Sequence, residues 1–230
     1  MSEQIQAPQE GQVMAEKLTG SFQKIQKPLL LGITVLALAI GGWWAYQEYV
    51  QKPKEEKAAE ALFMAERFFG QDSSRLVLDG NGSAKGVLYV INNFSGTQAA
   101  NLAHYYAGVS YLKLGEFENA VKHLKDFSTD AKQIQLLALG CLGDAYAELN
   151  KKTEAIDAYK KAAKAFDTDE NNASEYLFRA ALLAETNGQT KEALEIFKSI
   201  KSAYPKTDKG FQADKYIYRL SIEPNDLSSK

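Results

Sequence analysis

The chain has 230 residues, with 27 basic and 29 acidic side chains and a formal net charge of −2. This balance excludes a strongly basic protein built to bind nucleic acid or another polyanion. One cysteine excludes an internal disulfide, and two histidines leave little material for a metal site. The length is sufficient for one domain with a hydrophobic core.

Residues 1–27 form a polar N-terminal segment that is rich in glutamine. Its composition predicts a disordered tail, at least as far as Val13. A short amphipathic helix over residues 13–25 is the alternative, because Leu18, Phe22 and Ile25 recur at helical spacing.

An apolar stretch follows at residues 29–46, without charge, Asn, Gln or Pro. As a helix it would extend roughly 27 Å, close to the ~30 Å hydrocarbon core of a bilayer. A cleaved signal peptide is excluded, because its apolar core spans only about 7–15 residues, whereas this stretch continues into Trp43 and Trp44. We therefore predict one uncleaved transmembrane helix over residues 28–50.

The residues around this helix leave its orientation open. By the positive-inside rule, the side with more basic residues faces the cytoplasm, but here the two sides have three each. They are Lys17, Lys24 and Lys27 before the helix, and Lys52, Lys54 and Lys57 after it. Ala37, Gly41 and Ala45 recur every four residues, which predicts a face for close packing against another membrane helix. The alternative is that small residues are simply frequent in membrane helices.

A predicted helical domain over residues 53–223 begins with a degenerate hairpin over residues 54–95. Residues 54–70 have an apolar face opposite Lys and Glu, and residues 86–94 are expected to form the paired helix, with a strand as the alternative. Residues 73–86 between them are predicted to be a loop. Its Gly80-Asn81-Gly82 is no phosphate cradle, because no Lys-Ser or Lys-Thr pair follows.

The rest of the domain contains a sequence pattern that recurs along the chain. The stretch GVSYLKLG at residues 108–115 returns as GDAYAELN at residues 143–150, and a third copy is shifted by a further 38 residues. We predict helical hairpins at about residues 101–134, 136–169 and 174–207, a capping helix at residues 208–221 and a disordered tail at residues 224–230.

Each hairpin has the same predicted construction. Small residues allow the two helices to cross closely, a Gly or Asn suits a left-handed turn, and a larger residue fills the space against the next unit. The crossing residues are Gly108, Gly143 and Ala181 on first helices and Ala120, Ala155 and Ala193 on second helices, the turn residues are Gly115, Asn150 and Gly188, and the filling residues are Leu124, Tyr159 and Phe197.

This pattern resembles the tetratricopeptide repeat, in which hairpins of roughly 34 residues stack into a superhelix. The predicted fold is therefore all-α, with a single N-terminal transmembrane helix followed by a solenoid of such hairpins and a C-terminal capping helix. In such an array the first helices line a concave groove that suits an extended or helical peptide. The predicted groove residues are Tyr105, Tyr106, Val109, Cys141, Asp144, Glu148, Phe178, Arg179 and Leu182; the alternative for each aromatic residue is packing on a neighbouring helix.

The sequence contains no convergent set of catalytic residues. His104 and His123 lack the spacing of a zinc-protease helix, and no serine lies in a nucleophile elbow. Cys141, within a repeat helix, is typical of a small packing residue. The sequence predicts a protein that is not an enzyme and that has no cofactor or metal.

The order of segments also resembles one bacterial family. A polar tail, an apolar helix ending in GWW, a degenerate hairpin and Gly-x-x-Tyr repeats are similar to the YfgM-like family of ancillary SecYEG translocon subunits. The resemblance implies a single-pass inner-membrane protein with a cytoplasmic N terminus and a periplasmic repeat domain. It also implies three kinds of partner, namely the Sec translocon, a membrane-anchored periplasmic chaperone or prolyl isomerase, and emerging secreted chains.

The implied function is a scaffold that binds proteins at the translocon exit and assists their chaperone-linked folding or handover. The alternative is a general adaptor for envelope assembly, in cell division or outer-membrane biogenesis, without contact to Sec.

Overall fold

The computed structural model describes residues 10–222, with side chains described from residue 28 onward. The chain divides into two compact units, residues 1–53 and 54–230, which are considered separately. The start of the polar tail and the predicted disordered tail at residues 224–230 lie outside the described residues.

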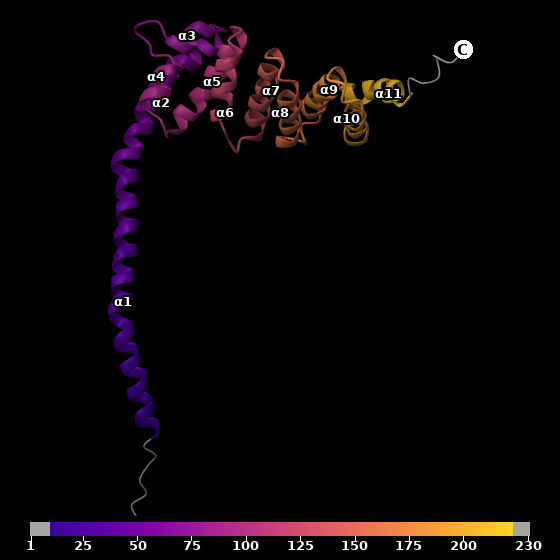
Figure 1. Ribbon diagram of the computed structural model, residues 1–230. Helices are drawn as coiled ribbons and strands as arrows, with labels where there is room; N and C mark the ends of the chain where they lie inside the picture. Colours follow the sequence, from indigo (N-terminus) through magenta and orange to yellow (C-terminus); the bar gives the residue numbers. More distant parts are fainter. Residues whose placement is uncertain (1–9, 223–230) are drawn as a thin grey trace, which may run out of the picture. The chain divides into compact units, whose positions relative to one another are not determined.

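The N-terminal unit contains α1 (Glu10–Tyr46) and a π-helical turn, η1 (Gln47–Gln51), which leads into α2 (Lys52–Gly70) (Figure 1). The helix starts well before the predicted span, so residues 13–25 have helical backbone and Pro28 lies inside α1. Side chains from residue 29 to residue 46 are exposed, except the half-buried Ala45. In the described part of the chain, this is the one helix long and apolar enough to cross a membrane.

The C-terminal unit begins with three helices: α2, α3 (Ser74–Asp79) and α4 (Val87–Asn93). The predicted helix at residues 86–94 is confirmed, but the loop prediction for residues 73–86 is wrong in its first half. Val77 and Leu78 are 0% and 1% exposed, so burial of this apolar pair stabilises a short helix that turn composition did not reveal. Gly80 and Lys85 then pair as an isolated antiparallel bridge that closes the remaining loop.

Three helical hairpins follow, and Figure 1 shows them side by side from α5 to α10. They are α5 (Gln98–Lys113) with α6 (Phe117–Asp126), α7 (Lys132–Glu148) with α8 (Lys152–Ala165), and α9 (Glu170–Thr186) with α10 (Thr190–Ala203). The last helix, α11 (Asp208–Ser221), packs against α10 and α9.

The small residues at the helix crossings have the role that the repeat pattern predicted. A Cβ on Gly108 would lie 2.5 Å from the Leu124 side chain, and one on Gly143 would lie 2.5 Å from the Tyr159 ring. Real Cβ atoms do not approach other atoms so closely, so only glycine permits these crossings. The turns have positive φ at Gly115 (75°), Asn150 (56°) and Gly188 (77°), as expected for left-handed helix ends.

The core consists of three clusters that run along the stack, and neighbouring clusters share residues at their borders. Leu102 and Tyr111 pack against both the first and the second cluster, and Leu139 and Tyr146 against both the second and the third. Each hairpin therefore completes the core of its neighbour, which is the packing of a helical solenoid. The predicted all-α fold is confirmed.

Candidate protein-binding surface

The first helices of the hairpins form one side of the stack. α5 contacts α7, and α9 contacts α11, whereas each second helix packs between first helices. Close approach of first helices is the arrangement of the inner side of a repeat array. We call the side formed by α5, α7 and α9 the first-helix face.

Aromatic side chains begin this face at α5. The Tyr106 ring lies 4.8 Å from the Phe69 ring of α2, and the Tyr105 ring lies 5.3 Å from the Phe127 ring. Both tyrosines are half-buried, and the Tyr106 hydroxyl donates to Glu66 Oε1 at 3.4 Å. These rings therefore pack against neighbouring helices and also leave part of their surface accessible to solvent.

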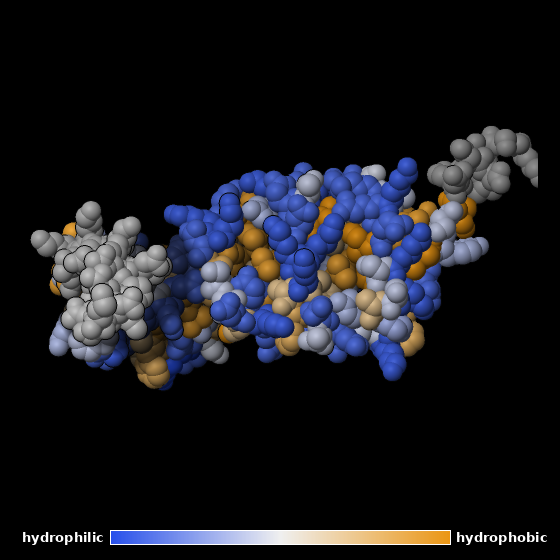
Figure 2. All heavy atoms as spheres, turned by 90° about the horizontal axis from the view of Figure 1, so that it is seen from below, coloured by the Kyte–Doolittle hydropathy of each residue, from blue (hydrophilic) through white to orange (hydrophobic). Residues whose placement is uncertain are grey.

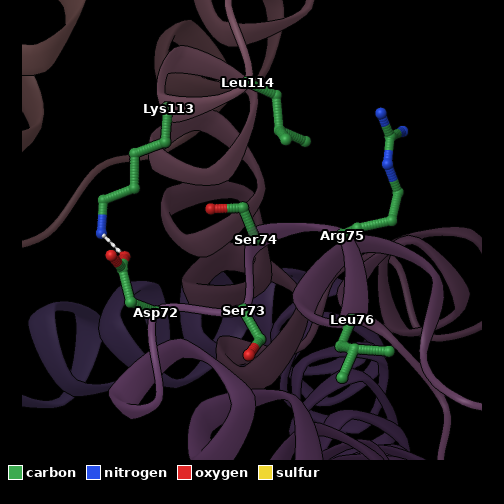
Figure 3. Close-up of a pocket in the computed structure, with 7 residues that line it drawn as sticks. All are labelled: Asp72, Ser73, Ser74, Arg75, Leu76, Lys113 and Leu114. Carbon is green, nitrogen blue, oxygen red and sulfur yellow. Dashed lines mark hydrogen bonds and ion pairs between the residues drawn. The ribbon is translucent and has the colours of Figure 1, made fainter.

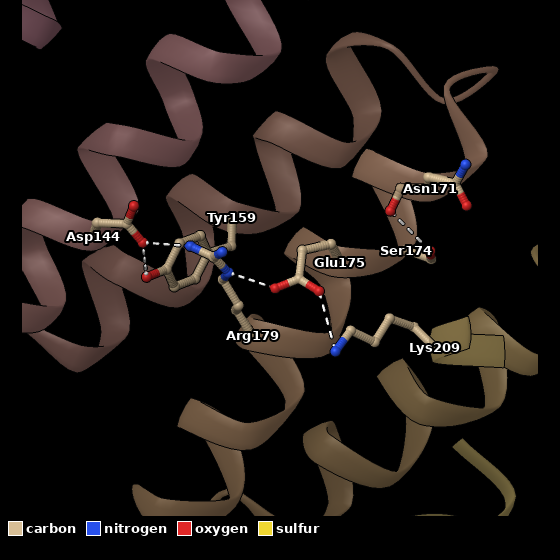
Figure 4. A network of polar contacts seen from close by, with 7 residues as sticks. All are labelled: Asp144, Tyr159, Asn171, Ser174, Glu175, Arg179 and Lys209. Atoms are coloured by element: carbon tan, nitrogen blue, oxygen red, sulfur yellow. Dashed lines mark hydrogen bonds and ion pairs between the residues drawn. The ribbon is translucent and has the colours of Figure 1, made fainter. Parts of the chain in front are cut away.

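A polar network continues the face from α7 to α11 (Figure 4). Asp144 Oδ1 accepts hydrogen bonds from Tyr159 (2.8 Å) and from Arg179 Nη1 (2.9 Å). Arg179 Nε also donates to Glu175 Oε1 at 2.9 Å, and Lys209 Nζ lies 3.2 Å from Glu175 Oε2. The exposed guanidinium of Arg179 joins two hairpins, and Glu175 extends the network to α11.

These contacts fix the charges of the network. Burial raises the pKa of the Glu175 carboxyl, but hydrogen bonds from Arg179 and Lys209 outweigh this and lower it overall. Burial lowers the pKa of Arg179, yet the Glu175 and Asp144 carboxylates raise it overall. At neutral pH the surface therefore presents a cation flanked by two carboxylates.

Cys141 lies on α7, where it is half-buried against the second core cluster. Burial, followed by the charge of Asp144, raises the pKa of its thiol to about 11. The thiolate is the reactive form of cysteine, so this thiol is a poor nucleophile at neutral pH. Its position is that of a packing residue between repeats.

The predicted groove residues differ in how much surface they offer. Val109 and Phe178 are only 8% and 5% exposed, and the Phe178 ring packs against the Phe197 and Tyr216 rings. Their side chains therefore belong to the core. Leu182 is half-buried against the C-terminal cluster, and Glu148 is exposed at the end of α7.

Sequence reasoning missed two residues of this surface, Glu175 and Lys209, and the buried Tyr176 that packs beneath it. Tyr176 occupies the repeat position held by Ala103 and Ala138, so a large residue has replaced a small one there. The nearby Gly140 makes room for it, because a Cβ on Gly140 would lie 2.2 Å from the Tyr176 ring. A comparison of residue sizes at equivalent repeat positions would have revealed this pair.

Among the pockets of the C-terminal unit, two lie against the first and second hairpins. One, of about 660 Å³, lies at the end of α5 beside α3 (Figure 3). Its two cations are already paired, Lys113 with Asp72 and Arg75 with Glu116 (3.1 Å), so it does not present free positive charge to an anion. The other, of about 300 Å³, lies between α6, α7 and α8 and has an apolar floor that includes Phe127 and Leu142.

No group of three or more potential metal ligands occurs among the residues that the structure describes. The fold does bring His104 and His123 together, with 3.1 Å between their Nδ1 atoms. Sequence spacing could not show this contact, because the two residues lie on different helices. When the Nδ1–H of one imidazole donates to the Nδ1 of the other, both Nδ1 atoms have a hydrogen-bond partner.

The predicted membrane face is open on α1. Ala37 and Gly41 are exposed, and a Cβ on Gly41 would meet no heavy atom within 4 Å. In a membrane, this stripe is therefore accessible to a second helix.

Comparisons with known proteins identify the repeats. Family models described as "Tetratricopeptide repeat" match residues 102–131 and residues 142–207. No sequence among the curated proteins matches the chain.

Among solved structures, the chain is similar to TPR-like repeats assigned to a kinesin light chain from Podosopora anserina. The identity is 14% and the TM-score 0.51, over 72% of this chain and 86% of that one. A variant of those repeats gives 13% identity and a TM-score of 0.50, over 72% and 85%. This likeness shows the fold alone, and none of these matches names the translocon-associated family. The chain is similar to tetratricopeptide repeats at residues 102–131 and 142–207, and its C-terminal unit is a TPR-like helical solenoid.

Proposed function

We propose that this protein is a membrane-anchored scaffold that binds segments of other proteins on its first-helix face. The supporting observation is the continuity of that face across three first helices, from the Tyr105 ring through Asp144 to Arg179. Half-buried aromatic rings supply apolar contact area, and an exposed guanidinium between carboxylates supplies orientation. The apolar α1 anchors this surface beside a membrane.

A mixed surface of this kind suits one class of ligand. A partner segment with aliphatic or aromatic side chains can pack on the tyrosine rings, while its carboxylate or backbone carbonyl competes for Arg179. The pocket at the end of α5 has both of its cations paired, which makes a polyanionic ligand a poor fit there. The partner is therefore an extended or helical segment of a protein.

The finer proposal is that the scaffold works at the exit of the Sec translocon, with the repeat domain in the periplasm and a chaperone or prolyl isomerase nearby. It rests on the resemblance of the segment order to YfgM-like proteins. A tethered domain meets an emerging chain at an effective concentration of the order of millimolar, so weak contacts are sufficient. The stripe of Ala37, Gly41 and Ala45 is the proposed contact with a membrane partner.

The binding proposal is tested on the first-helix face itself. A photoreactive amino acid replaces Tyr105 in one bacterial strain and Gly41 in another. After irradiation of the cells, the cross-linked adducts are identified by mass spectrometry. Adducts of Tyr105 with secreted chains and of Gly41 with translocon subunits are expected. Adducts confined to cell-division or outer-membrane assembly proteins would favour the adaptor alternative and refute the Sec proposal.

A matched pair of arginines separates binding from folding. Arg179→Ala removes the exposed cation of the face. Arg219→Ala removes a comparable arginine on α11, which pairs with Glu185 of α9. Fewer Tyr105 adducts are expected in Arg179→Ala alone. An equal loss in both variants would show that Arg179 has no specific part in binding.

A further inference from the structure

The exposed side of α11, the last described helix, carries large apolar side chains among polar ones. Phe211 and Tyr218 are 65% and 73% exposed, and Ile222, directly after the helix, is 56% exposed. The opposite side of the same helix holds the buried Gly210 and Ala213. Figure 2 shows hydrophobic atoms exposed at this end of the repeats. Three large apolar side chains that share one exposed side of a helix indicate a contact surface.

The spacing of these residues specifies a helix partner. Phe211, Lys215, Tyr218 and Ile222 follow one another at intervals of four, three and four residues. This is the spacing of the a and d positions that form the seam of a coiled coil. We call these four residues the α11 seam.

The intervals between the residues of the α11 seam are the same in both chain directions. If a second α11 runs antiparallel to the first, Phe211 lies opposite Ile222 of the other copy and Lys215 lies opposite Tyr218. A two-fold axis requires this kind of self-complementarity, because the same surface is used by both copies. We propose that two copies of the chain associate through antiparallel packing of their α11 seams, an interaction that is independent of the first-helix face.

The charges around the seam agree with this partner. Asp214 and Arg219 flank it, but they are already paired with Lys201 (2.5 Å) and Glu185 (2.6 Å). They therefore require no counter-ion from a partner. Lys215 has no ion pair within the described residues; its alkyl stem can cover the seam while its ammonium lies over the Tyr218 ring of the other copy.

The contact area argues for a weak dimer that depends on the membrane. Stable complexes bury more than about 1,200 Å², and one face of a 14-residue helix provides less than this. The anchor holds copies in the same membrane, which raises their effective concentration. The association is therefore measured with the full chain in membranes.

Cysteine cross-linking tests the register directly. In a Cys141→Ala background, two differently tagged full-length chains are coexpressed, one with Phe211→Cys and the other with Ile222→Cys. Mild oxidation of membranes is expected to give the mixed disulfide dimer, and little dimer when either variant is expressed alone. Absence of the mixed dimer, or equal cross-linking in the single variants, would overturn the antiparallel seam.

A second variant distinguishes the seam from general crowding in the membrane. Tyr218→Asp, added to both chains, is expected to abolish the cross-link without changing thermal unfolding, because the side chain is exposed. Phe63→Asp is the matched control, since Phe63 on α2 is an exposed aromatic residue outside the seam, 58% accessible. A cross-link that survives Tyr218→Asp, or is lost equally in Phe63→Asp, contradicts the proposal.

Discussion

At the residue scale, the contact between His104 and His123 is expected to make the first hairpin sensitive to acid. Tyr111 stacks on the His123 ring at 5.4 Å. Burial, then the neighbouring His104 and Lys122, lower the pKa of His123 to about 4, against a smaller opposite effect of Asp126. Burial likewise lowers the pKa of His104. Two protonated rings at this distance would repel each other and leave no acceptor.

The pH dependence of stability follows from these directions. An unfolded histidine has a pKa near 6.5, so between about pH 6.5 and 4 the unfolded chain binds more protons than the folded one. The contribution of the pair to stability is present above pH 6.5 and is lost as the pH falls toward 4. The thermal midpoint of the full chain in detergent, followed by circular dichroism, is expected to fall between pH 7 and pH 5.

His123→Gln keeps a hydrogen-bonding side chain beside His104 but cannot ionise. This variant is expected to flatten the pH dependence between pH 7 and pH 5. A decline as steep as that of the unmodified chain would show that other groups cause the acid sensitivity.

Gly140 is a second residue with a measurable role, because it receives the ring of Tyr176 from the next hairpin. Gly140→Ala forces an overlap and is expected to lower the free energy of unfolding by about 1–3 kcal/mol in urea denaturation. Replacing the ring as well, in Gly140→Ala with Tyr176→Leu, is expected to cost less than the sum of the single changes. Gly70→Ala is the control, since its Cβ would meet no heavy atom within 4 Å; an equal loss there would contradict a specific collision.

At the scale of whole elements, α2 is attached to the repeats through the N-terminus of α5. The Glu55 carboxylate accepts hydrogen bonds from the backbone N–H groups of Gln98 (2.8 Å) and Ala99 (2.9 Å). Thr97 accepts a third, from the Ala100 N–H at 3.0 Å. A carboxylate is favoured at this positive end of the helix dipole, so a side chain from α2 caps a helix of the repeat domain.

Loss of this cap is expected to weaken the attachment of α2 to α5. Glu55→Ala is expected to destabilise the domain by about 1–2 kcal/mol, because two N–H groups lose a charged acceptor. Hydrogen exchange of α2 amides is expected to accelerate more than that of α9 amides. Glu56→Ala, one residue along on an exposed position, serves as the control; a matching effect there would show that helix propensity and not capping is responsible.

The elements also show how far the sequence could be read. The hairpins from α5 to α10 were predictable, because helix crossings and turns each demand a particular residue size or backbone conformation, as at Gly143 and Asn150. The short α3 was not, because its Val77 and Leu78 are stabilised by burial that depends on the rest of the fold. The first-helix face was predictable only in part: repeat position identified Asp144 and Arg179, but burial of Phe178 depends on Tyr216, which lies outside the repeats.

At the scale of the whole molecule, the division into two units predicts that the repeat domain folds without the N-terminal unit. Removal of residues 1–53 is expected to leave the thermal midpoint of residues 54–230 unchanged, because the core clusters lie entirely within that unit. The shortened chain is expected to leave the membrane fraction and to lose its translocon adducts. Full copurification of this form with translocon subunits would refute the proposed role of the anchor.

The sharing of core residues between adjacent clusters has a consequence for how such a protein can change in length. Leu139 and Tyr146 complete the packing of one hairpin and begin that of the next, so every junction in the stack is local. A hairpin duplicated between α8 and α9 would meet surfaces of the same kind on both sides and would require no new core. Gene duplication can therefore lengthen the solenoid one hairpin at a time, while α2 and α11 stay unchanged on either side of the hairpins.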